Sequence, residues 1–351
     1  MNEIKFILTI LISLVFTFTL YVYLILYQFG APVEAEWWAS DLYNFKMSLI
    51  RSEKRRKVVL IGGSNILFGI NSKILSDKLK LPVYNLGVHF IMYKLDLVSL
   101  DEVLNENDIV IAGYEPDLYF LKDELNDWFV NNMLAWGKDI YIDKLSLSSK
   151  FQALFSIKPK RVFKGVISKL EHDLSFNKTS NLSEMTSFIY SKDLRDTTFY
   201  GYSYKSLNKN GDFIVNSKEF ANDNLSSINL FNDNESGVSS QSILFLKTLS
   251  ELVRRKKAHL VLTYSAMLKT KKFNKYSVSA VEKMNKFSAF MKKFNFIYYC
   301  DPFEFTYPRK YFLDSKYHLN EFGSKLRTKK LIDCLSQQST FNFLNVSIND
   351  E

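Results

Sequence analysis

The stretch that organises this chain is Lys57-Val58-Val59-Leu60-Ile61-Gly62-Gly63-Ser64-Asn65, an apolar run that ends in two glycines and a serine. Its β-branched residues predict a buried parallel strand, and its glycines permit a sharp turn after the strand. Ser64 then lies at the carboxyl end of a strand. Ligands and catalytic groups collect at that edge of an open α/β sheet, because the loops there meet the amino termini of helices. Ser64 is therefore a candidate functional residue.

Strand and helix signals alternate along the rest of the chain. Asn71 and Ser72 are suitable caps for the helix that follows the first strand. The expected elements are a helix carrying residues 74–79, a strand in 81–87, a helix through 97–104, a strand over 108–113, a helix near 241–257, a strand over 260–263, a helix through 281–291, a strand over 296–299, and a last helix containing Phe322 and Leu326. Strand–helix units in succession predict an α/β protein with a parallel, doubly wound sheet.

The periodic pattern fails between about 120 and 238, which predicts a large insertion. Its aromatic run, 199–204, either stacks on sugar rings or forms the insertion's own core, and aromatic burial favours the core. The expected organisation is a membrane anchor over 1–29, a linker over 30–56, a first part of the α/β domain over 57–119, the insertion over 120–238, a second part over 239–338, and a tail over 339–351.

An uncharged stretch of 22 residues runs from Phe6 to Tyr27. As a helix it is long enough to cross the roughly 30 Å hydrocarbon layer of a membrane. A cleaved signal peptide is the alternative, but its apolar core usually has about 7–15 residues. Basic residues lie on both sides of the span, while Glu34, Glu36 and Asp41 follow it. We expect a single-pass protein whose body is extracytoplasmic, either periplasmic or at the cell surface.

Charge and cysteine content leave several partner classes open. The net charge is +9, with 46 basic and 37 acidic residues, which is compatible with acidic glycans, anionic lipid or nucleic acid. The basic residues are scattered, and we expect no nucleic-acid partner. Cys300 and Cys334 form no metal motif. Buried free thiols are expected for them, with a single disulfide as the alternative if the domain is extracytoplasmic.

Ser64 gains interest from residues near the carboxyl terminus. A serine hydroxyl becomes a good nucleophile when a base accepts its proton, and a histidine oriented by a carboxylate does this near neutral pH. Asp314 and His318 lie four residues apart on one predicted loop, from which both can reach the same sheet edge. Neither a Walker pattern nor Gly-x-Gly-x-x-Gly is present, which argues against a nucleotide site. We expect no cofactor and no metal.

Three short blocks of this sequence resemble those of the SGNH or GDSL-type hydrolases. They are Gly62-Gly63-Ser64-Asn65, Asn85-Leu86-Gly87 and the segment from Asp314 to His318-Leu319-Asn320. The resemblance implies a three-layer, flavodoxin-like fold. It also implies Ser64 as nucleophile, His318 as base, Asp314 as its orienting partner, and the Ser64 and Gly87 amides as an oxyanion hole. Candidate pocket residues are Asn65, Asn85 and Glu115.

The chain departs from that family in two places. The usual Asp-x-x-His spacing is one residue longer here, as in membrane-anchored branches that resemble the D-alanyl transfer and alginate O-acetylation proteins. The family's Gly-x-Asn-Asp block corresponds to Gly113-Tyr114-Glu115-Pro116. Glu115 replaces an asparagine that donates to the oxyanion, and a carboxylate there repels the developing charge.

Two functions follow as hypotheses. The first is a membrane-anchored acyltransferase or esterase that adds or removes acetyl groups on a surface polysaccharide through an acyl-serine. The resemblance further suggests a multispanning O-acyltransferase as partner. The second is a catalytically inactive protein of the same fold that binds glycans or assists polysaccharide assembly. Glu115 and the large insertion motivate the second hypothesis.

Overall fold

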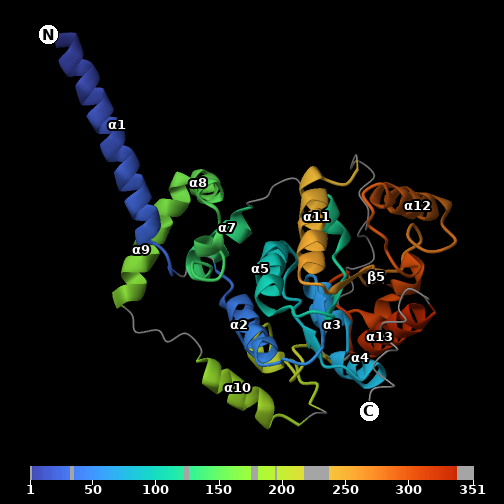
Figure 1. Cartoon of the computed structure of the whole chain (residues 1–351). Coiled ribbons are helices and arrows are strands. Elements are labelled where there is room, and N and C mark those ends of the chain that lie inside the picture. Colours follow the sequence, from blue (N-terminus) through green and yellow to red (C-terminus); the bar gives the residue numbers. More distant parts are fainter. Residues whose placement is uncertain are drawn as a thin grey trace. The chain divides into compact units, whose positions relative to one another are not determined.

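The computed structural model describes residues 2–31, 35–121, 126–174, 181–193, 196–216 and 237–337. The chain divides into two compact units (Figure 1). Unit 1 comprises 1–37 and 123–179, and unit 2 comprises 38–122 and 180–351. The expected insertion is therefore shared between the units, since its first part belongs with the amino-terminal helix. The expected tail, 339–351, lies outside the described residues.

Unit 2 is built on a parallel sheet of four strands. These are β1 (Val58–Ile61), β2 (Val83–Asn85), β3 (Ile109–Ala112) and β4 (His259–Leu262), in the order β2-β1-β3-β4. Val58 of β1 is in register with Val83 of β2 on one side and with Ile109 of β3 on the other. All residues of β1 and β3 are buried, as the uninterrupted apolar runs predict for parallel strands covered on both faces.

Helices follow the strands as predicted. The helices that lie between and after the strands in the predicted α/β segments are α3 (Ser64–Gly69), α4 (Ser72–Leu79), α5 (Tyr93–Val103), α6 (Pro116–Tyr119), α11 (Ser240–Arg255), α12 (Val278–Lys292) and α13 (Glu321–Ser336). Asn71 caps α4, because its side chain accepts a hydrogen bond from the Ile74 amide. Asn320 caps α13 in the same way. Helix α4 packs against α13, and α5 packs against α11.

The strand predicted over 296–299 is not a member of the main sheet. A single parallel bridge joins Tyr298 to Leu262, and the Tyr299 amide donates to the Leu262 carbonyl. Asn295 and Cys300, which flank this segment, have left-handed φ values of 62° and 77°. These turns limit the extended run to a few residues, so it pairs only once. A separate two-stranded parallel sheet is formed by β5 (Met267–Leu268) and β6 (Thr306–Tyr307).

The expectation of free thiols is wrong, because Cys300 and Cys334 form a disulfide. Helix α13 carries Cys334 alongside the turn at Cys300, which places the two Cα atoms 5.7 Å apart. That separation is within the normal range for a disulfide. Two cysteines 34 positions apart give no pairing signal by themselves, so only the packing of α13 decides between thiols and a bridge.

The stretch expected as a linker contains a helix, α2 (Trp37–Arg51). Leu42, Phe45 and Leu49 recur at helical spacing and are buried. Lys46, on the same helix, is 1% exposed. Its ammonium donates to the Gly87 carbonyl, and burial lowers the pKa of Lys46 to about 7. Helix α2 is thus part of unit 2.

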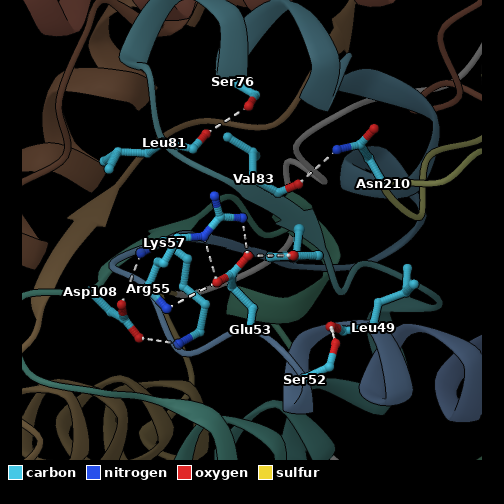
Figure 2. A network of polar contacts seen from close by, with 11 residues as sticks. Leu49, Ser52, Glu53, Arg55, Lys57, Ser76, Leu81, Val83, Asp108 and Asn210 are labelled. Atoms are coloured by element: carbon cyan, nitrogen blue, oxygen red, sulfur yellow. Dashed lines mark hydrogen bonds and ion pairs between the residues drawn. The ribbon is translucent and has the colours of Figure 1, made fainter.

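The amino end of the sheet is fixed by a buried ion pair, Lys57 with Asp108 (Figure 2). Their side chains are fully buried, and the Lys57 ammonium lies 2.7 Å from Asp108 Oδ2. The Asp108 carboxylate also accepts from the Lys57 and Asn105 amides. These bonds satisfy a buried charge at the point where β1 and β3 begin side by side.

Unit 1 contains α1 (Asn2–Tyr27), α7 (Asp127–Trp136), α8 (Leu147–Ser156) and α9 (Pro159–Leu174). Residues 3–27 of α1 have a mean hydropathy of 2.3 and are long and apolar enough to cross a membrane. Just after the end of α1, Gln28 accepts a hydrogen bond from Arg161 of α9, which also donates to the side chain of Asn131. The three polar side chains are buried, and the Arg161 guanidinium joins the other two.

The remainder of the expected insertion belongs to unit 2. It contains α10 (Leu182–Ser191) and a loop over 196–216. Asp212 of this loop is fully buried and accepts hydrogen bonds from Ser72 and Asn85. The Phe213 amide donates to the Leu67 carbonyl. The loop is therefore attached to α3, α4 and the end of β2.

Candidate active site

Ser64 is the first residue of α3, directly after the turn that ends β1. Gly62 has a φ of 144°, a conformation that favours glycine. A Cβ atom on Gly63 would meet the Glu115 carboxylate and would lie 2.6 Å from Phe90 Cα. Both glycines are thus required by the path of the backbone, and Ser64 is left half-buried at a helix amino terminus.

Asp314 and His318 meet on one loop, as predicted. The bridge between Phe312 and Leu319, together with a bond from the Leu313 amide to the His318 carbonyl, closes this loop before α13. His318 Nδ1 lies 2.7 Å from Asp314 Oδ1. Burial acts to raise the pKa of Asp314, but the hydrogen bonds from His318 and Tyr202 lower it overall. Asp314 is therefore held as a carboxylate.

Tyr202 completes this group, and the sequence did not single it out. Its hydroxyl donates to Asp314 Oδ2 over 2.7 Å and lies 3.4 Å from His318 Nδ1. The Tyr202 ring packs against Trp38, with centroids 5.1 Å apart. The members of the aromatic run 199–204 thus have different surroundings. Phe199 and Tyr202 pack beside the candidate site, whereas Tyr200 is 45% exposed and contacts Phe188.

Phe68 connects the histidine to the serine helix. The His318 ring stacks on the Phe68 ring with a centroid distance of 4.3 Å and an interplanar angle of 16°. Phe68 is four residues after Ser64 in α3, and residues at that spacing share one face of a helix. The stacking therefore places His318 over the face of α3 that also carries Ser64.

The Ser64 hydroxyl does not contact this histidine. Among the described residues it donates only to Glu115 Oε1, over 3.4 Å. The same oxygen accepts from the Asn65 amide at 2.9 Å. Glu115 is 1% exposed, and Oε2 has no hydrogen-bond partner among the described residues. Burial raises the pKa of Glu115, which the bond from the Asn65 amide partly offsets.

The Gly87 amide, which the resemblance implied as an oxyanion-hole donor, already donates within its own turn. The Gly87 amide donates to the side-chain oxygen of Asn85 at 2.9 Å. A Cβ atom on Gly87 would lie 2.8 Å from the Gly63 carbonyl, so the glycine is explained by the close approach of two loops. Asn85 also donates to the Ile66 carbonyl and is 1% exposed. Both residues position the turns around α3 and do not line an open pocket.

Asn65, the third candidate pocket residue, is fully buried. Its side-chain amide nitrogen donates to the Gly113 carbonyl, just after the end of β3. The guanidinium of Arg327, from α13, donates to both the carbonyl and the side-chain oxygen of Asn65, and also to the Tyr264 carbonyl. Arg327 is 1% exposed. The turn that carries Ser64 is thus tied to β3 and to α13.

The sequence pointed to the candidate serine, histidine and aspartate more clearly than to the residues that position them. Arg327 and Phe68 have no distinguishing sequence context, because each lies in an ordinary helix pattern. The arrangement contains a serine at a helix amino terminus and a histidine held by a carboxylate, which are the groups used in acyl transfer. Among the residues that the structure describes, no group of three His, Cys, Asp or Glu side chains is placed to hold a metal ion.

The chain was compared with models of protein families and with curated proteins, and neither comparison found a match.

Proposed function

We propose that this protein is a membrane-anchored, serine-dependent acyltransferase or esterase with an SGNH-like fold, acting on a surface polysaccharide. The observation that carries the proposal is the Asp314–His318 pair stacked on Phe68, four residues from Ser64 on the same short helix. The strand order β2-β1-β3-β4 supports the doubly wound part of this fold, since 2-1-3-4-5 is the flavodoxin-like order. The packing of α4 against α13 and of α5 against α11 supports the helix–sheet–helix layers of the proposed fold.

The proposed chemistry follows from the hydrogen bonds. Asp314 accepts from His318 Nδ1, so Nε2 is the ring nitrogen that takes the Ser64 proton. The Ser64 oxygen attacks an ester carbonyl, and the histidine returns the proton to the departing alkoxide. Water or a sugar hydroxyl then attacks the acyl-serine with His318 again as base. Stacking on Phe68 and the bond from Tyr202 to Asp314 hold the ring in one orientation.

The location is part of the proposal. Helix α1 has the length and hydropathy of a single membrane span. The Cys300–Cys334 disulfide supports a body outside the cytoplasm, because disulfides persist in oxidising compartments. A catalytic unit attached to the outer face of the membrane lies beside emerging polysaccharide and beside a membrane-borne acyl donor.

The test is covalent labelling of Ser64. The full chain in detergent is treated with a fluorophosphonate or an aryl acetate, and intact mass is measured for the parent, Ser64→Ala and Ser183→Ala. Ser183 is an exposed serine of α10 and is the matched control. We expect an adduct on the parent and on Ser183→Ala, and none on Ser64→Ala. An adduct that persists in Ser64→Ala, or none on any of the three, refutes Ser64 as nucleophile.

A second candidate function is supported by one observation. The Ser64 hydroxyl donates to Glu115, a buried carboxylate, and not to His318. That arrangement suits a protein that binds glycans without acyl chemistry. In that case no adduct forms, and a strain carrying Ser64→Ala keeps normal levels of acylated surface polysaccharide. Loss of the ester groups in this strain, at a normal protein level, excludes the second candidate.

A further inference from the structure

We infer that α8 and α9 form a second membrane-binding surface, which lies in the bilayer interface beside α1. Both helices carry a row of exposed apolar side chains along one side. The surface, called here the α8–α9 face, consists of Leu147, Phe151, Phe155, Phe163, Ile167 and Leu170. It is independent of the Ser64 chemistry and rests on α1 spanning a membrane.

The spacing of these residues gives each helix one apolar face. In α8 they recur every four residues, and in α9 at intervals of four and three, so each set lies within a narrow stripe of the helix surface. Leu147, Phe155 and Phe163 are 72%, 71% and 70% exposed. Large exposed side chains that gather in this way mark a surface that binds a partner or a lipid phase.

Contacts with α1 identify the partner as the bilayer. The Phe155 ring stacks on Phe18 with centroids 6.5 Å apart. Close by, the Tyr21 hydroxyl donates to the Ile157 carbonyl over 2.7 Å. Phe18 is nine residues before the end of α1 at Tyr27, which corresponds to roughly 14 Å along a helix. The lipid that surrounds Phe18 must therefore also surround Phe155.

The packing between α8, α9 and α1 supports the same placement. Ile25 of α1 forms a buried apolar cluster with Leu134, Ile157 and Val162. Residues 3–20 of α1 are exposed along nearly all of their length, whereas burial begins at 21. The free part of α1 thus ends where α8 and α9 begin to cover it. Figure 1 shows α8 and α9 gathered at the carboxyl-terminal end of α1.

Charge around Phe163 favours an anionic lipid surface. Lys160 is exposed on the same helix, three residues before Phe163. A helix with lysines beside an apolar stripe binds in the interface plane, where its apolar face enters the acyl boundary and its ammonium groups meet phosphates.

The experiment uses the full chain reconstituted in vesicles. An environment-sensitive fluorophore is attached to a cysteine introduced singly at Phe155 or Phe163, with Gln152 and Lys164 as matched positions off the apolar stripe and Val15 as a position within α1. We expect the Phe155 and Phe163 labels to show blue-shifted emission, quenching by nitroxide lipids and protection from aqueous iodide. The Gln152 and Lys164 labels are expected to be quenched by iodide. Anionic lipid is expected to increase the shift at Phe163.

Three results overturn the inference. Iodide quenching at Phe155 and Phe163 equal to that at Gln152 and Lys164 means that the α8–α9 face meets water. Protection from iodide without quenching by nitroxide lipids means that protein covers the face, either a second copy or another chain. Absence of lipid quenching at Val15 removes the premise that α1 lies in the bilayer. None of these results bears on covalent labelling of Ser64, so the two proposals fail separately.

Discussion

Replacing Glu115 by glutamine tests the electrostatics beside Ser64 directly. The Glu115 carboxylate accepts from the Asn65 amide and from the Ser64 hydroxyl, at the helix terminus where an oxyanion would otherwise be stabilised. Glutamine retains an oxygen that accepts from both donors and removes the negative charge. If His318 is the base, the variant must therefore acylate faster than the parent.

The magnitude follows from the geometry. Ser64 Oγ lies 3.4 Å from Glu115 Oε1. The oxyanion is the former carbonyl oxygen of the substrate, which is bonded to the carbon that Oγ attacks. The two negative charges are then on the order of 4 Å apart, a repulsion of about 4 kcal/mol at an effective dielectric constant of about 20. Ser64 is only half-buried, so solvent reduces this value. A gain of roughly a hundredfold in rate, equivalent to about 3 kcal/mol, is expected.

The assay is single-turnover release of the leaving group from an aryl acetate at mildly alkaline pH. Burial raises the pKa of Glu115, and alkaline pH favours its ionised form. Asp117→Asn is the matched control, since Asp117 is an exposed carboxylate two residues away that pairs with Lys316 at 3.4 Å. It should leave the rate almost unchanged. A loss of activity in Glu115→Gln would refute the reasoning, because it would show that Glu115, and not His318, takes the Ser64 proton.

The same variant has an expected effect on stability. Burial raises the pKa of Glu115, so the folded state disfavours its ionised form. The stability associated with protonated Glu115 is present in acid and is lost as the pH rises through this raised pKa. Glu115→Gln should therefore have a larger free energy of unfolding than the parent near neutral pH, and this advantage should disappear in acid. Urea unfolding of the two proteins at several pH values measures the difference.

Three further perturbations test the structure of unit 2. Replacing Cys300 by serine opens the disulfide loop of 34 residues and should lower the free energy of unfolding by about 4 kcal/mol; equal urea midpoints with and without reductant would contradict this. Lys57→Met leaves the Asp108 carboxylate buried without its counter-ion, so a loss of about 3–5 kcal/mol is expected by chemical denaturation; Lys73→Met, at an exposed pair, should cost far less. Burial lowers the pKa of Lys46 to about 7 from 10.5, so the unfolded chain binds more protons than the folded one between these values. Parent stability should therefore rise with pH from 7 towards 10, by up to about 1.4 kcal/mol per unit, and Lys46→Met should lose that slope.

The sequence by itself determined the local elements of the α/β unit. Val58–Ile61 and Ile109–Ala112 form strands because continuous apolar, β-branched runs suit a sheet covered on both faces. The caps at Asn71 and Asn320 and the glycine turn before Ser64 are also local, since short-range hydrogen bonds and backbone sterics fix them. The spacing of Asp314 and His318 allowed their pairing to be predicted for the same reason.

Only the tertiary structure decided the contacts between distant segments. The disulfide between Cys300 and Cys334 and the hydrogen bond from Arg327 to the Asn65 carbonyl in the Ser64 turn each join segments that have no local sequence signal for one another. Tyr202 reaches Asp314 from 112 positions away. Such contacts depend on where the whole chain brings each side chain, because packing and burial, and not neighbouring residues, select them.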